Sequence, residues 1–274
     1  MYKTLAVHVD DSPHIEARVR AAAQLADGFG ARVMGCAATG MSWPALVMLA
    51  GSLHVEPRAQ FDAIRAQARE RLARFAERAR AAGMAAPDES LVEEESRVAM
   101  LLQSRYADLV ITGQPADEVP PLDGLPQYLA LHGPRPVLVV PRQYAGAPLT
   151  GNIVIGWNGS TQAIRAIDAA LPLLQRAAGV RLVMVAPGPE AALNGPEPGA
   201  AMAQYLAGHG VRAELVHDEG RLPAGDALLE AAQSWGAGLL VAGAFGHSRL
   251  RELVLGGATR LLLERAPVPV LFAH

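Results

Sequence analysis

Lysine and cysteine are almost missing from the sequence, and each shortage excludes a kind of site. Lys3 is the only lysine among 24 basic residues, so no GxxxxGK[ST] phosphate loop can form. A lysine Schiff base is disfavoured too, because Lys3 lies at the start of the first expected strand. Cys36 is the only cysteine, which rules out an internal disulfide and a cysteine metal site and agrees with a reducing compartment. We expect Cys36 to be a small buried hydrophobe.

The sequence also lacks strong charge and long apolar runs. Its net charge is -3 and its pI is near 6.2, so it carries no basic field that would attract nucleic acid or an anionic membrane surface. No window approaches the roughly 18 consecutive apolar residues of a membrane span. Residues 1–11 lack the basic and apolar regions of a signal peptide. With 51% hydrophobic residues, the chain is expected to be globular, soluble and cytoplasmic, with neither nucleic acid nor membrane as a partner.

An internal repeat organises the chain. Four apolar, strand-like segments recur in the same order between 130 and 149 residues further along. The first-copy segments begin at Thr4, Arg32, Asp108 and Pro136, and the second-copy segments begin at Asn152, Arg181, Gly238 and Pro269. Two copies of one domain are therefore predicted, residues 1–145 and 150–274, with a Pro- and Gly-rich link whose boundary falls near residue 146.

Stretches of helical character separate the strand-like segments in both copies. In the first copy they are residues 16–29, 58–82 and 96–106, and in the second 163–177, 199–209 and 224–235. Continuous apolar strands that alternate with helices indicate a parallel sheet covered on both faces. The predicted fold class is α/β, with two tandem doubly wound, Rossmann-like domains. We also expect a pseudo-dimer in which the last strands, residues 137–140 and 270–273, pair antiparallel.

A glycine loop follows the third repeated strand of the second copy. Gly243 is followed by two residues and Gly246, then by nine residues and Gly256, before a helix that is expected to open near Ala258. Glycine allows the backbone to approach a phosphate, and the free amides of a helix N-terminus attract an anion. The carboxyl end of a parallel strand is also where an open α/β sheet binds its ligand. The loop is therefore a candidate phosphate site, and ordinary turns are the structural alternative.

The sequence resembles the universal stress protein family in its tandem form. The resemblance depends on the opening Val7-His-Val-Asp-Asp-Ser12, the G-x2-G-x9-G spacing and the closing Ala266-Pro-Val-Pro-Val-Leu-Phe272. It implies binding of ATP or the related ADP or AMP, with Mg2+ as an optional companion. Matching positions would place the end of the first strand and one backbone position of the second strand at the adenine and ribose, and the glycine loop at the ribose and phosphates. The implied site residues are Gly156, Trp157, Asn158, Val185, Gly243, Ala244, Gly246, His247, Gly256, Gly257, Ala258 and Thr259.

Two departures from the family pattern affect this site. The first-strand acid is Asn158 in the second copy, although the first copy keeps Asp10. The Ser or Thr that usually follows the third glycine is Gly257, which leaves Thr259 as the nearest hydroxyl. In the first copy Gly113 is followed by prolines and acids that remove donors and repel phosphate. We therefore predict one nucleotide per chain, in the second copy.

For several residues, a purely structural role is the alternative to a role in binding. Trp157 is expected to pack in the core or to lie against the adenine, and His247 to donate to a phosphate or to be a solvated loop residue. Asp10 is read as an acid that caps a turn. Arg249, Arg251 and Arg260 are expected to add positive charge near the glycine loop or to be ordinary surface arginines that only solubilise.

The sequence offers little for catalysis. It contains no GxSxG elbow, no HExxH spacing and no general base for nucleotide hydrolysis, so no catalytic or metal-binding residue is predicted and any ATPase would be slow. The leading hypothesis is a stress-response module that binds an adenine nucleotide and acts in binding or signalling. The alternatives are an interaction scaffold that binds no nucleotide and, third, a slow ATP hydrolase.

An apolar insertion in the first copy, residues 43–49, has no counterpart in the second. If it were exposed, it would form an apolar patch that favours association. We therefore expect it to cover the vacated site of the first copy or to build an oligomer contact in a homodimer of tandem chains. Core packing is the alternative.

Overall fold

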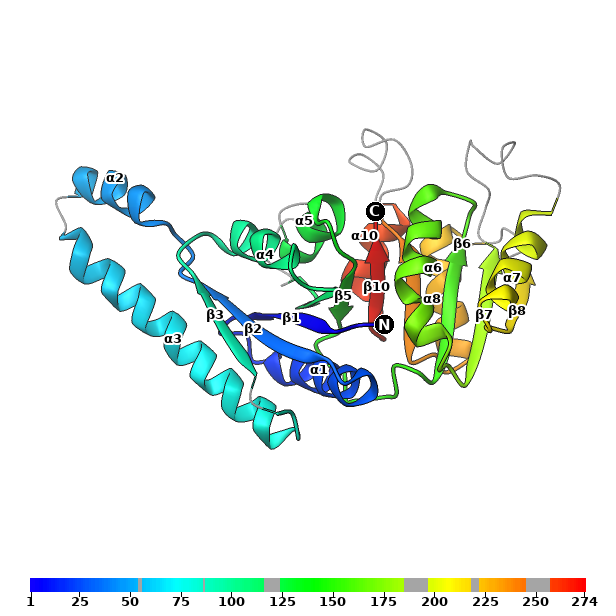
Figure 1. Ribbon diagram of the computed structural model, residues 1–274. Coiled ribbons are helices and arrows are strands. Elements are labelled where there is room, and N and C mark those ends of the chain that lie inside the picture. Colours follow the sequence, from blue (N-terminus) through cyan, green and yellow to red (C-terminus); the bar gives the residue numbers. More distant parts are fainter. Residues whose placement is uncertain (54–55, 86, 116–123, 185–196, 218–221, 245–256) are drawn as a thin grey trace. The chain divides into compact units, whose positions relative to one another are not determined.

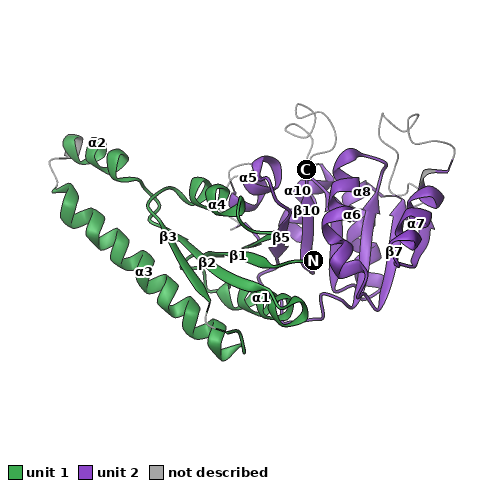
Figure 2. Cartoon of the chain, viewed as in Figure 1, with its two compact units in different colours: residues 1–113 green, residues 114–274 purple. Residues whose placement is uncertain are grey.

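The computed structural model describes residues 1–53, 56–85, 87–115, 124–184, 197–217, 222–244 and 257–274. These residues form two compact units, residues 1–113 and 114–274 (Figure 2). Each unit contains parallel strands with helices between them, so the predicted α/β class is confirmed.

The sheet of the first unit has the strand order β3-β2-β1-β4, and every pair in it is parallel. Its strands are β1 (Thr4–Val9), β2 (Arg32–Ala38), β3 (Asp88–Val92) and β4 (Leu109–Gly113). β1 and β4 are neighbours although two strands separate them in the sequence. The chain direction across the sheet therefore reverses between β1 and β4, and the carboxyl ends of these strands form the switch point of the unit.

Three of the unit's helices cover its sheet: α1 (Ile15–Phe29), α3 (Pro57–Ala81) and α4 (Ser96–Ser104). α1 and α3 lie against each other on one face, and α4 covers the other (Figure 1). α1 ends at Gly30, whose left-handed backbone (φ 60) lets its N–H bond to the carbonyl of Ala26. Residues 16–29, 58–82 and 96–106 were predicted to be these helices, so their existence is confirmed within a few residues.

The apolar insertion forms an extra helix, α2 (Trp43–Leu53), which packs on α3. The ring of Trp43 meets the ring of Phe61 edge to face, with centroids 5.4 Å apart. Leu46 is buried, whereas Met48 is 80% exposed. α2 extends beyond the strands with α3 and lies away from the ends of β1 and β4 (Figure 1). Part of the insertion therefore packs in a core, and part of it remains an exposed apolar face.

The sheet of the second unit has the strand order β5-β10-β9-β6-β7-β8. Its strands are β5 (Val137–Val140), β6 (Asn152–Trp157), β7 (Gly179–Met184), β8 (Ala213–His217), β9 (Leu239–Gly243) and β10 (Val270–Ala273). β6 pairs in parallel with β7 and with β9, so the carboxyl ends of β6 and β9 are the switch point of this unit.

The helices of the second unit are α5 (Leu125–His132), α6 (Thr161–Leu174), α7 (Pro198–Gly208), α8 (Ala224–Ser234) and α10 (Ala258–Arg265). α6 and α7 are neighbours, and the hydroxyl of Tyr205 donates to Asp168 at 2.8 Å. α8 and α10 pack on each other, with α8 also against β6. The helices expected over residues 163–177, 199–209 and 224–235, and the helix opening near Ala258, are confirmed.

The last strands of the two copies pair as predicted. β10 is parallel to β9 on one side and antiparallel to β5 on the other, with Leu271 opposite Leu138. Both leucines are fully buried. This pairing covers an apolar edge that each copy would otherwise expose.

The compact units do not follow the repeat. α5 and β5 belong to the first copy in sequence but to the second unit in packing, because β5 pairs with β10. The predicted boundary between the two copies, near residue 146, stays a prediction. The repeat also did not predict the edge strands β3 and β8, which are partly exposed and contain polar residues.

Candidate functional site

The switch point of the second unit brings together several residues that the sequence predicted. Trp157 ends β6 and Asn158 follows it, while Gly243 ends the neighbouring strand β9 and Ala244 follows it. The N–H of Ala244 donates to the carbonyl of Ala273 at 2.8 Å, which fixes the chain where it leaves β9. The two strand ends therefore present a defined backbone surface, while Val185, Gly246, His247 and Gly256 lie outside the described residues.

Gly243 is in direct contact with the start of α6. A Cβ atom there would lie 2.6 Å from the backbone nitrogen of Ala163 and 2.7 Å from the carbonyl carbon of Gln162. Its φ is not in the left-handed region, so a turn does not require the glycine. The close approach of the two backbones requires the glycine, and it places the amino end of α6 beside the end of β9.

Asn158 shapes the turn between β6 and α6. Its Oδ1 accepts a hydrogen bond from the N–H of Ser160 at 3.1 Å, and the hydroxyl of Ser160 accepts one from the N–H of Ala163 at 3.2 Å. The first interaction is an Asx turn, and the second is the N-cap of α6. In the first unit Asp10 makes the same turn by accepting from the N–H of Ser12 at 3.1 Å, as predicted for a turn-capping acid. The turn needs an acceptor oxygen rather than a charge, so Asn158 preserves it.

The first turn of α10 starts at Gly257 without a side-chain cap. The first N–H groups of a helix have no partner within the helix, so this turn can offer amides to an anion. Thr259, the nearest hydroxyl, lies in the same turn and is buried. α10 is held in place by α8, because a Cβ on Gly225 would lie 3.1 Å from the Cα of Ala258.

Gly156 and Trp157 have packing roles. A Cβ on Gly156 would lie 2.8 Å from Leu228 of α8, so this glycine allows α8 to approach β6. Trp157 is only 5% exposed, which favours core packing over an open ring surface. Both findings show that part of the predicted site has a structural reason for its residues.

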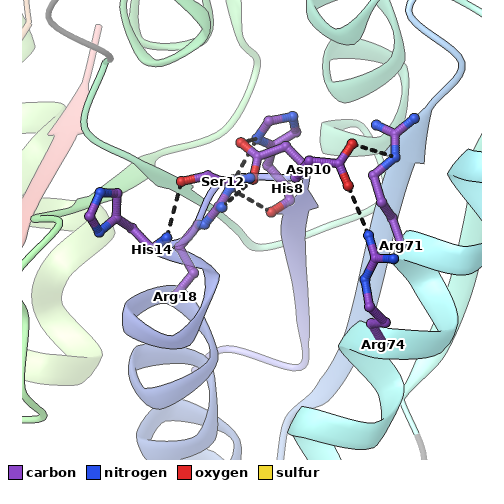
Figure 3. A network of polar contacts seen from close by, with 8 residues as sticks. His8, Asp10, Ser12, His14, Arg18, Arg71 and Arg74 are labelled. Atoms are coloured by element: carbon purple, nitrogen blue, oxygen red, sulfur yellow. Dashed lines mark hydrogen bonds and ion pairs between the residues drawn. The ribbon is translucent and has the colours of Figure 1, made fainter.

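The corresponding place in the first unit contains a charged network (Figure 3). Arg18 of α1 is 2% exposed, and its Nη2 donates to Oδ1 of Asp10 at 2.5 Å. Its Nη1 donates to the carbonyl of His8 at 2.9 Å and lies 3.2 Å from Nδ1 of the same residue. Next to it, Asp11 accepts from Arg74 of α3 at 2.8 Å. The sequence reading did not single out Arg18 or His8.

The network shifts two pKa values. Burial lowers the pKa of His8 to about 4. The negative charge of Asp10 raises this pKa, and the positive charge of Arg18 makes a smaller contribution that lowers it. Burial alone would raise the pKa of Asp10, but the charge and hydrogen bond of Arg18 outweigh it and lower this pKa. Near neutral pH the pair is therefore Asp10 carboxylate with Arg18 guanidinium, and His8 is neutral. Burial also raises the pKa of Cys36 to about 12, which fits the expected inert thiol.

A cavity of about 680 Å³ lies elsewhere in the first unit. Its lining includes Gly30, Arg32, Met84 and Asp88, which belong to the amino ends of β2 and β3 and to the ends of α1 and α3. Arg32 and Asp88 are joined by an ion pair of 2.5 Å. The cavity is thus at the opposite end of the strands from the switch point.

None of the described helices is long and apolar enough to cross a membrane. Within the same residues, no group of three or more His, Cys, Asp and Glu side chains is placed to hold a metal ion.

Fold and strand-end geometry define a doubly wound α/β protein with two related copies joined through their last strands. Residues 150–274 match the model of the universal stress protein family. This part of the chain is therefore similar to the universal stress protein family, and the predicted resemblance is confirmed.

Solved structures extend the fold to the whole chain. A universal stress protein from Archaeoglobus fulgidus DSM 4304 is 15% identical, with 98% of this chain and 95% of that chain covered and a TM-score of 0.74. A protein of unknown function from Pseudomonas aeruginosa PAO1 is 14% identical, with 99% and 92% covered and a TM-score of 0.61. At these identities the likeness concerns the fold. Among curated proteins, none matches the chain.

Proposed function

We propose that the chain binds ATP or a related adenine nucleotide in its second unit and acts as a stress-response binding or signalling module. The observation that carries the proposal is the contact between Gly243 and the first turn of α6, which places the amino end of a helix beside the end of β9, although the N–H of Ala163 itself is bonded to Ser160. The uncapped start of α10 at Gly257 adds a second set of amides. Backbone amides of this kind bind phosphate without a lysine.

Each described residue has a role in this proposal. Asn158 holds the turn at the end of β6, where the ribose would lie, and Ala244 and Ala258 leave room beside the phosphates. Gly246, His247 and Gly256 are assigned to the phosphates, and Val185 to the adenine, from the family resemblance alone. Mg2+ would contact the phosphates rather than a carboxylate, since Asn158 is neutral. A cytoplasmic location and a homodimer of tandem chains stay predictions.

A scaffold that binds no nucleotide is the second candidate. It is favoured by the packing of Gly156 against Leu228 and of Gly243 against Ala163, because both glycines have a structural reason that needs no ligand. A slow ATP hydrolase ranks third, since the sequence contains no evident general base for nucleotide hydrolysis.

Native mass spectrometry of freshly purified protein separates these candidates. The proposal expects a fraction of the chains to carry one adenine nucleotide, and added ATP to bring the rest to one. A spectrum that stays free of nucleotide after ATP addition favours the scaffold. Phosphate release above the background of a Gly246→Val variant would instead support the hydrolase.

A further inference from the structure

Arg18 is a buried cation on a helix face that is otherwise apolar. The buried face of α1 includes Ile15, Val19, Ala22 and Leu25, and Arg18 lies among them with 2% exposure. Burying a guanidinium is costly unless it is paired and hydrogen-bonded. The position of Arg18 therefore demands local partners.

Those partners are the polar groups at the carboxyl end of β1. The guanidinium contacts the carboxylate of Asp10 and the backbone carbonyl and ring of His8, while its Nε is buried without a partner among the described residues. The side chain also reaches β4, because a Cβ on Gly113 would meet Arg18 atoms at 3.7 to 3.9 Å. Arg18 thus stands between the ends of β1 and β4, at the switch point of the first unit.

The second copy has no such side chain at the matching position of its helix, which the structure describes. Ala166 is the residue that lies 148 positions after Arg18, the same interval that separates Asp10 from Asn158. There α6 touches Gly243 directly, at 2.6 Å from the nitrogen of Ala163, whereas Gly113 meets the arginine first. Gly156 likewise replaces His8. The two switch points therefore differ in what fills the space beside the glycine.

We propose that Arg18 is an internal occupant of the ligand position in the first unit and closes it to nucleotide. This inference rests on the proposed function, in which the second unit binds the nucleotide. It adds the residue that restricts nucleotide binding to that unit. The guanidinium fills the space at the strand ends and uses the carboxylate of Asp10 as its counter-ion.

The charges around the network support an occupant rather than an open anion site. Asp10 is already paired with Arg18, and Asp11 is paired with Arg74 at 2.8 Å and with Arg71 at 3.4 Å. A phosphate entering here would have to displace these carboxylates or lie beside them. Together with the prolines and acids that follow Gly113 in the sequence, the network disfavours a second nucleotide.

A site-resolved titration tests the closure. ATP is added while the ring signals of His8, assigned with His8→Gln, and the indole signal of Trp157, assigned with Trp157→Phe, are followed by NMR. We expect the Trp157 signal to move and the His8 signals to stay. Movement of the His8 signals at the same ATP concentrations would overturn the closure. If neither signal moves, the proposed function fails, and the next experiment decides the role of Arg18 by itself.

The second experiment removes the side chain of Arg18 and uses guanidinium ion as a probe of the space that it leaves. Arg18→Ala should lower Tm by several degrees, while Arg20→Ala, at an exposed position on the same helix, should lower it less. Guanidinium ion at tens of millimolar should then raise the Tm of Arg18→Ala relative to equal NaCl, by binding where the arginine stood, and should not raise that of wild type or Arg20→Ala. Equal Tm values for the two variants, or an equal effect of guanidinium on both, would overturn the proposal. If Arg18→Ala does not fold, Arg18→Gln takes its place in the same comparison.

Discussion

A Cβ atom on Gly243 would lie 2.6 Å from the backbone nitrogen of Ala163, so the end of β9 and the first turn of α6 are in backbone contact. This contact positions a helix N-terminus at the switch point of the second unit. The matching contact of the first unit, at Gly113, is made by the side chain of Arg18. The two copies of one fold therefore present different chemistry at equivalent strand ends.

The close contact at Gly243 predicts a stability cost for any larger residue. Gly243→Ala should lower the free energy of unfolding by about 1–3 kcal/mol, because the methyl group overlaps backbone atoms that cannot easily move. Gly208→Ala is the control, since a Cβ at that helical position meets nothing within 4 Å and should stabilise by up to about 1 kcal/mol. Urea unfolding of both variants makes the comparison. Equal stabilities would mean that α6 can shift away from Gly243.

The turn at Asn158 predicts how a carboxylate at this position would change Mg2+-dependent ATP binding. Asn158→Asp should leave the fold stable, because Asp10 accepts the same hydrogen bond in the first unit. It should also make ATP affinity depend more strongly on Mg2+, since a carboxylate oxygen is a preferred Mg2+ ligand. Binding titrations with and without Mg2+ measure this. An unchanged Mg2+ dependence would place the metal away from residue 158.

The buried His8 predicts loss of stability in mild acid. Its folded pKa of about 4 lies below the ordinary 6.5, so the unfolded chain takes up the proton first. Its contribution is fully present above pH 6.5 and is lost as the pH falls towards 4, by about 2 kcal/mol between pH 6.5 and 5. The lowered pKa of Asp10 acts in the same direction at lower pH.

Urea unfolding at pH 7 and pH 5 isolates the histidine, because Asp10 stays ionised at both values. His8→Gln removes this titration, so the difference in unfolding free energy between the two pH values should shrink relative to wild type. If wild type and His8→Gln show the same difference, His8 is not held neutral in the folded protein.

The insertion helix α2 predicts two separate effects. Leu46 is buried and Met48 exposed, so Leu46→Asp should reduce stability, whereas Met48→Asp should leave it unchanged. If the exposed face builds an oligomer contact, Met48→Asp will reduce the mass measured by light scattering. An unchanged mass with unchanged stability would show that this face is only a solvated surface. In the described residues α2 packs on α3, and covering of the first unit's switch point by this helix stays a prediction.

The sequence predicted those strands and helices whose residues form a repeated or strongly apolar pattern. Leu138 and Leu271 lie in short apolar segments whose unpaired edges would be exposed, and their antiparallel pairing follows from that. β3 and β8 were missed because an edge strand keeps polar residues such as Asp88 and Glu214, which weaken the signal.

The charged network was missed for a different reason. Arg18 lies only two residues from the exposed Arg20 in the same helix, and its burial depends on the distance between α1 and β4, which the spacing of residues does not encode. One signal was available: aligning the copies sets Arg18 opposite Ala166, on the face defined by Ile15, Val19 and Ala22. The packing roles of Gly156 and Gly243 were equally hidden, because a glycine in a sequence does not show whether it admits a ligand or a helix.

Titration calorimetry with ATP tests the central claim most directly, on wild type, Gly246→Val and Gly113→Val. The account predicts one site per chain. Gly246→Val should weaken binding by about 1–3 kcal/mol, because a β-branched side chain would stand where the backbone approaches phosphate. Gly113→Val should leave affinity and stoichiometry unchanged, since Arg18 already fills the space beside it. Two sites per chain, equal sensitivity to both substitutions, or no binding at all would contradict it.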